Sequence, residues 1–324
     1  MITRRTFAAT ALAALPLAST AFGQKKVTPN ASRFGGVQIG VQTYSYRTLR
    51  DFTKPLDLAG QKELVNRIVD AMVQNQINSC EFWIAFIEPV GGTYSRTGTT
   101  PAMLAAREEL KKWRLSHPME IFEYSRKAIT DAGIAINSAM FNFTDYIVDG
   151  EIDHAFEAAK ALGTRVVSAN CTVRSIKRAA PFADKHNLLL AAHSETAPFD
   201  ANIDGMVFGN NLLDAVKHSP NMRITLDTGH FTAYGQNALQ FVKDHHDKIV
   251  NLHLKDRLKN HPEPHTDENT PEFGKGDAPI KEILQFMKQR KLTFPATIEY
   301  EYKSDRPAVE EVRRCIDYAK AALA

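Results

Sequence analysis

Residues 224–230 read ITLDTGH, a short apolar run that stops at an acid, a turn and a histidine. Side chains two apart share a face of a strand, so Thr225 and Asp227 point away from the face that carries Leu226. Asp and Gly are common where strands end and chains turn, and a plain strand end is the simplest interpretation. A functional interpretation requires polar partners on other strands.

Apolar runs of this kind recur along the chain and alternate with amphipathic segments. They define eight candidate strands, at residues 36–46, 77–83, 134–140, 164–170, 187–193, 222–228, 248–256 and 293–302. Helical patterns fall at residues 62–76, 153–163, 237–246, 279–291 and 307–324, and a glycine follows the second of them at the expected cap position, Gly163. Eight strand–helix units in roughly 290 residues predict an α/β fold, a single (β/α)8 TIM barrel.

A doubly wound open sheet is the rival fold, but it normally carries a Gly-rich phosphate turn after its first strand. Here the first strand ends in QTYSYR, which lacks such a turn. Two long loops are expected, at 85–116 and 257–278. Both follow strand C-termini, the face on which barrel active sites lie.

The N-terminal segment is distinct from the rest of the chain. Residues 1–23 contain Arg4 and Arg5, then Phe7 and an Ala/Leu-rich run, without any acid. This pattern is typical of a twin-arginine export signal, so we expect a signal at 1–23, a linker at 24–35 and the barrel at 36–324. The mature protein would then be periplasmic, with no membrane anchor after cleavage. An uncleaved N-terminal anchor helix is the alternative, although the run is short and Ala-rich for a membrane span.

Charge and cysteine content narrow the class of partner. The net charge is +3, and without the two arginines of residues 1–23 there are 38 basic against 37 acidic residues. A near-neutral protein has no electrostatic attraction for nucleic acid or anionic membrane, so we expect neither as a partner. Three widely separated cysteines predict no disulfide framework. The composition leaves an oligomer open.

Five candidate strands place polar groups on one face near their C-terminal ends. Alone, an Asp there is usually a turn residue, a His a core residue and a Glu part of a solvated rim. Together, converging carboxylates would repel one another unless a cation compensated them, and histidine with carboxylates suits Mn²⁺, Mg²⁺, Co²⁺ or Zn²⁺. The spacing therefore predicts a divalent metal site. The residues on these faces are Ser79, Glu81, Trp83, Leu189, Ala191, His193, Thr225, Asp227, Asn251, His253, Lys255, Thr297, Glu299 and Glu301.

Apart from its first residues, almost the whole chain resembles the xylose isomerase-like TIM barrel superfamily. Within it, the chain is most similar to bacterial sugar phosphate isomerases/epimerases, including an exported branch. The fold hosts many reactions, so the resemblance implies a site more specifically than one activity. The stretches that carry it are CEFW (80–83), REELKKWRLSHP (107–118), ITLDTGH (224–230), NLHLKDR (251–257), FGKGD (273–277) and TIEYEY (297–302).

The resemblance implies a set of metal ligands. Members hold the metal with a Glu on the fifth strand, an Asp on the sixth, a His on the seventh and a Glu on the eighth. The last three carry over as Asp227, His253 and Glu299. The fifth strand departs, because it reads Ala191-Ala192-His193 where relatives read Glu-Asn-His or His-Asn-His. His193, two residues on and on the same face, is the candidate replacement, and a metal site weakened or left vacant by Ala191 is the alternative.

The resemblance also implies a reaction. Such isomerases and epimerases abstract a proton from a carbon next to a carbonyl and form an enediolate, while the metal polarises the substrate oxygens. Glu299 is the expected base, Glu81 a second one, and Lys255 an acid or a counter-charge for the enediolate. The loss of a glutamate at Ala191 favours isomerisation or β-elimination over two-base epimerisation. Export and the missing phosphate turn favour a neutral sugar or keto-sugar as substrate.

Substrate contacts are expected from five side chains. The resemblance assigns His230 to substrate or to a second metal. Trp83 and Tyr44 are placed to stack on sugar faces, and Asn251 and Arg257 come from the NLHLKDR stretch.

Two alternative functions remain open. One is a 3-keto-glycoside lyase or hydrolase that acts by β-elimination, and another is a metal-depleted barrel that binds carbohydrate. A nuclease like endonuclease IV is disfavoured, because Glu268 and Thr270 stand where an Asp and a His of its zinc cluster are expected. The near-zero charge of the mature chain also argues against a duplex-binding surface.

Overall fold

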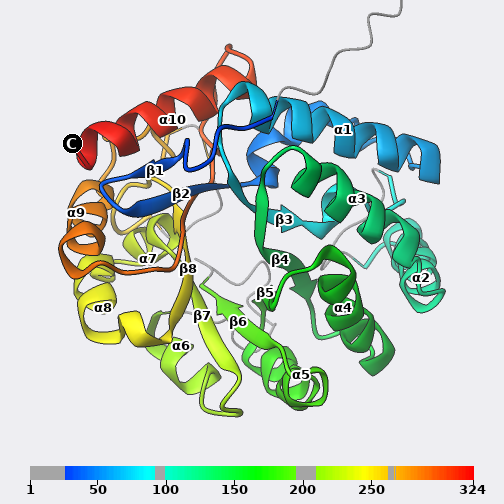
Figure 1. Ribbon diagram of the computed structural model, residues 1–324. Coiled ribbons are helices and arrows are strands. Elements are labelled where there is room, and N and C mark those ends of the chain that lie inside the picture. The colour runs from blue at the N-terminus through cyan, green and yellow to red at the C-terminus, as the bar shows by residue number, and fades with distance from the viewer. Residues whose placement is uncertain (1–25, 92–98, 195–208, 262–265, 267) are drawn as a thin grey trace, which may run out of the picture.

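The computed structural model describes residues 26–91, 99–194, 209–261, 266 and 268–324 (Figure 1). Within them, eight parallel strands close into a barrel, because the last barrel strand, β9, pairs with the first, β2. The predicted single (β/α)8 barrel is therefore confirmed. The barrel strands are β2 (Val37–Gln42), β3 (Ser79–Trp83), β4 (Ala135–Phe143), β5 (Val166–Cys171), β6 (Leu189–His193), β7 (Met222–Asp227), β8 (Ile249–Leu254) and β9 (Ala296–Ile298).

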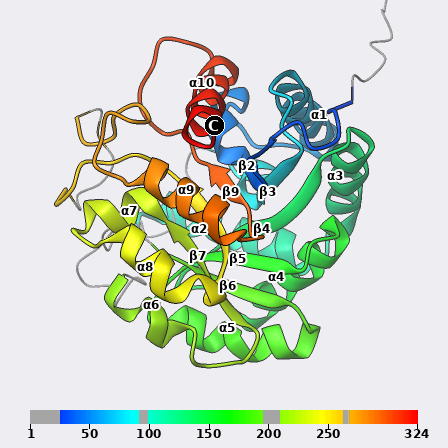
Figure 2. The ribbon, with the colours of Figure 1, turned by 60° about the vertical axis from the view of Figure 1, so that its left-hand side comes forward.

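Helices surround the strands as an outer ring, and the turned view of Figure 2 brings α7, α8 and α9 forward. Three 3-10 turns, η1 (Thr43–Leu49), η2 (Ile84–Phe86) and η3 (His246–Lys248), supplement them. The helices are α1 (Leu58–Gln74), α2 (Pro101–Leu115), α3 (Met119–Asp131), α4 (Asp149–Leu162), α5 (Val173–His186), α6 (Gly209–Ala215), α7 (Thr228–Ala233), α8 (Ala238–His245), α9 (Ile280–Arg290) and α10 (Ala308–Ala322).

Alternation along each strand divides the barrel wall into two faces. In β7, Ile224 and Leu226 are fully buried against the helix layer, and Thr225 and Asp227 point into the barrel. Gly163 ends α4 with φ 78°, the left-handed conformation expected of a C-terminal cap. The outward apolar residues and the inner helix faces make one continuous core.

The structure changes three local expectations. The stretch 85–116 contains α2 rather than only loop. Thr100 caps this helix and Pro101 lies in its first turn, a combination that commonly starts a helix and that the sequence prediction overlooked. The first predicted strand, 36–46, stops at Gln42 and continues as η1. The eighth is shorter than 293–302, although the Glu299 amide still bonds to Leu254 O.

The N-terminal predictions are only partly within the described residues. The export signal at 1–23 lies outside them. In the predicted linker, Arg33–Phe34 forms β1 and pairs antiparallel with β2. No described helix is long and apolar enough to cross a membrane. Cys80, Cys171 and Cys315 are buried, and no two of them form a disulfide.

Candidate metal centre and active site

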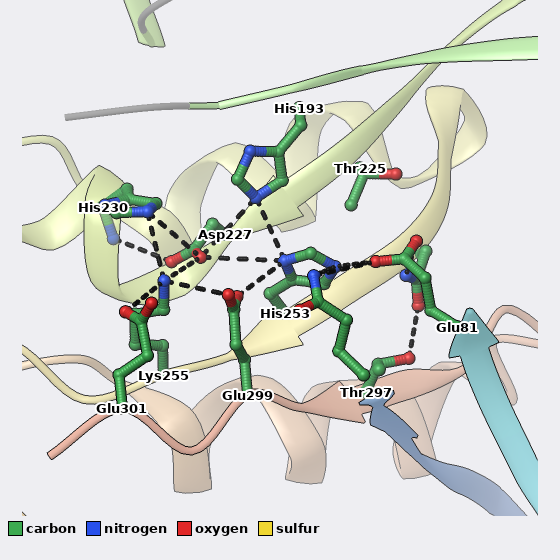
Figure 3. A network of polar contacts seen from close by, with 12 residues as sticks. Glu81, His193, Thr225, Asp227, His230, His253, Lys255, Thr297, Glu299 and Glu301 are labelled. Carbon is green, nitrogen blue, oxygen red and sulfur yellow. Dashed lines mark hydrogen bonds and ion pairs between the residues drawn. The ribbon is translucent and has the colours of Figure 1, made fainter. Parts of the chain in front are cut away.

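Four side chains from four consecutive strands meet at the C-terminal end of the barrel (Figure 3). They are His193, Asp227, His253 and Glu299, all buried, and one donor atom from each lies within 4.8 Å of the others. His253 Nδ1 is 2.9 Å from Glu299 Oε2 and 3.0 Å from His193 Nε2. Asp227 Oδ2 is 3.6 Å from His193 Nε2. The structure thus brings together the four residues that we predicted as metal ligands.

The local fold of ITLDTGH explains how the Asp227 carboxylate is oriented toward this cluster. Asp227 caps α7, because its Oδ1 accepts the His230 amide at 2.8 Å, and its Oδ2 is left facing the other donors. A Cβ on Gly229 would lie 2.8 Å from Lys255 Cγ, so only glycine lets α7 pack this closely on the end of β8. The Thr228 hydroxyl bonds to the carbonyls of His253 and Lys255 at 3.0 Å each. The motif therefore joins β7, α7 and β8 into one rigid support.

The donor set fits a divalent cation. Asp227 Oδ2 and Glu299 Oε2 are buried and make no well-directed hydrogen bond. Metal–ligand bonds of about 2.0–2.2 Å place neighbouring donors roughly 3–3.6 Å apart. Here neighbouring donor atoms are 2.9, 3.0, 3.6 and 3.8 Å apart, and all four lie within 4.8 Å of one another, so the set is slightly wider than a bound ion requires. Imidazole nitrogens combined with carboxylate oxygens suit Zn²⁺, Mn²⁺ or Co²⁺.

His193 supplies the donor that Ala191 lacks. Ala191 is fully buried and pairs with Ser168 on β5 and Arg223 on β7. His193, the last residue of β6, reaches both His253 and Asp227 (Figure 3). The cluster consequently has four donors, and a weakened affinity for metal stays a prediction.

Lys255 lies at the centre of the negative charge. Its ammonium is 2.8 Å from Glu301 Oε2, 3.1 Å from Asp227 Oδ2 and 3.2 Å from Glu299 Oε2. It also approaches His230 Nε2 at 3.1 Å. Burial lowers the pKa of Lys255, but the carboxylates outweigh it and hold that pKa well above the ordinary value. This direction favours the charged ammonium form of Lys255 over the neutral amine that a base would need.

Charges around the cluster shift two other groups. Burial raises the pKa of Asp227, but His230 and Lys255 more than reverse this and hold it well below the ordinary value. Burial lowers the pKa of His253, and Glu81 and Glu299 more than compensate, so it is held well above its usual range. Asp227 therefore remains ionised, which favours a bound cation at the cluster.

The structure does not support Glu81 as a second base. Its side chain is fully buried beneath His253, and its Oε1 lies 2.6 Å from His253 Nε2, the ring nitrogen turned away from the cluster. Burial raises the pKa of Glu81, but His253 and its hydrogen bonds lower it to about 2. A carboxylate so strongly ionised and so enclosed cannot take a proton from a substrate.

Asn251 and Arg257, both predicted to contact substrate, instead bond to other protein groups. Asn251 is 1% exposed, donates to Glu81 Oε2 at 3.0 Å and accepts from the Thr297 hydroxyl at 2.6 Å. Arg257 is fully buried and donates to the carbonyls of Asn269 and His261. Asn251 thus lies in a layer below the cluster, and Arg257 anchors the loop that follows β8.

The remaining predicted substrate contacts lie beside the cluster. Tyr44 and Trp83 are half-buried and meet edge to face with ring centroids 4.8 Å apart. Burial and the neighbouring Glu301 raise the pKa of Tyr44 to about 12, which keeps its hydroxyl protonated. His230 is 5% exposed and packs edge-on against His193 at 5.8 Å. Their contact with a substrate stays a prediction.

Sequence reasoning missed several polar residues of this end of the barrel. Gln42 and Ser138 both donate to Glu81, at 3.1 and 2.6 Å. Glu301, for which the sequence predicts no role beyond its place on the face of Glu299, is paired with Lys255. Gln42 is a polar residue at the inward-facing end of an otherwise buried strand, and that signal could have identified it.

Fold and centre together define a class: a (β/α)8 barrel with a buried two-histidine, two-carboxylate centre at the C-terminal ends of consecutive strands. The chain belongs to the xylose isomerase-like TIM barrel family, whose sequence profile matches residues 150–321. No curated protein matches the chain.

Solved structures share the fold at low sequence identity. A sugar phosphate isomerase/epimerase from Parabacteroides distasonis is 15% identical, with a TM-score of 0.54 over 89% of this chain and 95% of the other. The IolI protein with a bound zinc atom is 13% identical, with a TM-score of 0.57 over 89% and 99%. The 3-keto-D-glucoside 4-epimerase YcjR from E. coli, in its apo form, is 13% identical, with a TM-score of 0.53 over 88% and 99%. Sugar isomerases and epimerases are therefore among the structural neighbours of this barrel.

Proposed function

We propose that the protein is a metal-dependent enzyme of the sugar isomerase/epimerase type that abstracts a proton next to a carbonyl of a sugar or keto-sugar. The observation that carries this proposal is the cluster of His193, Asp227, His253 and Glu299, with two buried carboxylate oxygens aimed at its centre. Zinc in the related IolI structure supports a divalent cation here. Such a cation would polarise the oxygens of the substrate and make the adjacent C–H bond more acidic.

Glu299 is the base in this proposal. It is 6% exposed and lies at the edge of the cluster, where a substrate would approach. A carboxylate can ligate through one oxygen and receive a proton on the other. Lys255, an ammonium next to Glu299, supplies positive charge where an enediolate oxygen would become negative.

A single base favours some reactions of this class over others. Because Glu81 is enclosed beneath His253, we assign proton transfer at the cluster to Glu299, the other of the two predicted bases. Isomerisation needs one base, which returns the proton to the former carbonyl carbon. β-Elimination also needs one, and the electron pair then expels the group β to the carbonyl. Epimerisation at one carbon ordinarily needs a base on each side of the substrate.

The second candidate function is therefore a lyase that cleaves a 3-keto-glycoside by β-elimination. The same single-base geometry supports it, and the fold likeness to a 3-keto-D-glucoside 4-epimerase makes keto-glycosides a reasonable substrate class to test. A periplasmic location, from the twin-arginine pattern of residues 1–23, is part of this proposal and suits non-phosphorylated sugars.

Hydrogen exchange in D₂O tests the proposal. The protein, loaded with Mn²⁺, Co²⁺ or Zn²⁺, is incubated with aldoses, ketoses and 3-keto-glycosides, and deuterium at carbon is followed by NMR. We expect deuterium incorporation that disappears in chelator and in Glu299→Gln. Products then separate isomerase from lyase. Sugar binding by a protein that takes up no metal and exchanges no hydrogen would instead identify a carbohydrate-binding barrel.

A further inference from the structure

The two ring nitrogens of His253 face different surroundings. Nδ1 points to the cluster, 2.9 Å from Glu299 Oε2 and 3.0 Å from His193 Nε2. Nε2 points the other way, 2.6 Å from Glu81 Oε1 (Figure 3). A carboxylate accepts only, so Nε2 must carry a hydrogen and donate it. The imidazole can then offer a lone pair to a cation only through Nδ1.

Glu81 itself is held rigidly. Its Oε1 accepts from His253 and from Gln42 on β2, and its Oε2 accepts from Ser138 on β4 at 2.6 Å and from Asn251 on β8 at 3.0 Å. Four donors fill the accepting capacity of a carboxylate. The Glu81 oxygens therefore have one orientation, set by three other strands of the barrel.

Asn251, one of the hydrogen-bond donors to Glu81, is itself held by a further hydrogen bond. The Thr297 hydroxyl on β9 donates to Asn251 Oδ1 at 2.6 Å, which turns the Asn251 amide nitrogen toward Glu81. Glu81, Ser138, Asn251 and Thr297 are all at most 1% exposed. Burial of a carboxylate is costly unless its hydrogen bonds are complete, and here they are. The polar side chains of this layer are therefore arranged around the Glu81 carboxylate.

We propose that Glu81 is a positioning residue that fixes the ring plane of His253 and commits it to ligation through Nδ1. The inference rests on the proposed metal centre. Outer-sphere carboxylates that accept the second N–H of a ligating imidazole orient the ring and raise its basicity, and their loss weakens metal affinity about 10–100-fold. Glu81, far from the cluster in sequence, performs this role from β3.

Glu81→Gln tests the inference, because glutamine keeps the shape but loses the charge and two of the accepting positions. Affinity for Zn²⁺ or Mn²⁺ is measured by competition with a chelator of known affinity. We expect Glu81→Gln to weaken binding about 10–100-fold. Glu311→Gln is the matched control: Glu311 is fully buried and ion-paired with Arg306, but has no contact with the cluster. It should lower thermal stability while leaving the metal dissociation constant unchanged within about twofold.

NMR of protein with ¹⁵N-labelled histidine supplies a readout that a general loss of stability would not move. In wild type we expect a slowly exchanging, downfield proton on His253 Nε2, with or without metal, and loss or a large upfield shift of it in Glu81→Gln. Ser138→Ala, which removes one donor to Glu81, should give a smaller shift. Unchanged metal affinity and an unchanged Nε2–H signal in folded Glu81→Gln would overturn the inference.

The same measurements separate the two proposals. If wild type takes up no divalent ion, the proposed metal centre fails. The Nε2–H signal in metal-free protein still shows whether Glu81 holds His253, and its absence in wild type would overturn the positioning role.

Discussion

The ammonium of Lys255 lies 3.1 Å from Asp227 Oδ2, the oxygen that Asp227 directs at the candidate metal cluster. The same ammonium is 3.2 Å from Glu299 Oε2, the other carboxylate donor of that cluster. Lys255 therefore offsets the negative charge of both carboxylate donors. In the enzyme that we propose, folding stability, metal affinity and catalysis would all depend on this one side chain.

Replacing Lys255 by Met should separate these effects. Breaking a buried ion pair leaves the carboxylates uncompensated, so metal-free protein should lose about 3–5 kcal/mol of stability. Divalent cations should then bind more tightly and restore part of that stability. Turnover should fall about 100-fold or more, because no fixed positive charge faces the enediolate. Thermal melts with and without Mn²⁺, and kcat, measure these effects. Lys62→Met, at an exposed pair with Glu120, is the control. Weaker metal binding in Lys255→Met would contradict the proposed coupling.

His193→Ala should show that a histidine replaces the missing glutamate of the fifth barrel strand. His193 Nε2 lies within 3.6 Å of two other donors, so its removal takes away one metal ligand. We expect affinity to fall at least about 100-fold, more than loss of an outer hydrogen-bond partner causes. Chelator competition measures the change.

A second variant sharpens that test. Ala191→Glu, combined with His193→Ala, puts a carboxylate two residues earlier on the same face of β6. Partial recovery of metal affinity would locate the vacancy at Ala191. Wild-type affinity in His193→Ala alone would show that His193 is no ligand.

Gly229→Ala should destabilise the protein because of the close approach of α7 to β8. The added Cβ would meet Lys255 Cγ at 2.8 Å and Arg257 Cγ and the Lys255 carbonyl at 2.9 Å. Forced overpacking of this kind costs about 1–3 kcal/mol. Chemical denaturation measures the loss, and a shift of Lys255 should also reduce turnover. Gly60→Ala, whose nearest atoms are 3.3 Å away, should have little effect.

His154 should make the protein sensitive to acid. It is 1% exposed between Trp113 and Phe122, and neither of its ring nitrogens has a hydrogen-bond partner. Burial, with the nearby Arg114 and His117, lowers the pKa of His154 to about 3. The unfolded chain binds a proton below about pH 6.5 and the native protein does not, so stability falls as pH drops from 6.5 toward 3.

The size of this effect can be measured against a variant. Between pH 7 and pH 5, His154 should account for about 2 kcal/mol of lost stability. His154→Phe should remove that part of the pH dependence in urea titrations at both pH values. Equal pH dependence of wild type and variant would show that another group is responsible.

Much of this site could be predicted from alternation along the strands. A residue near the C-terminal end of a barrel strand, on the face opposite its apolar neighbours, must point into the barrel mouth. That rule placed His193, Asp227, His253 and Glu299 within a larger set of inward-facing residues. The resemblance to the family then singled out these four as ligands, and the structure brings them together. Metal binding by them stays a prediction.

Alternation did not predict how far along the barrel axis each inward-facing side chain lies. Glu81 and Asn251 point inward as expected, but they lie one layer below the cluster and bond to each other. Alternation specifies the face of a strand, whereas the stagger between neighbouring strands specifies the level. Arg257 failed for a different reason, because it lies past the end of β8, where no strand pattern applies.

The sequence by itself determined the barrel, since eight apolar runs separated by amphipathic helices can bury their surfaces in few other ways. The sequence also determined which side chains could ligate a metal, and it places at position 191 an alanine, which has no ligand atom. Only the tertiary structure decided that Lys255 would join Asp227, Glu299 and Glu301. It likewise decided that Glu81 would support His253 instead of facing a substrate. These roles depend on distances between strands far apart in the chain, and closure of the barrel alone sets those distances.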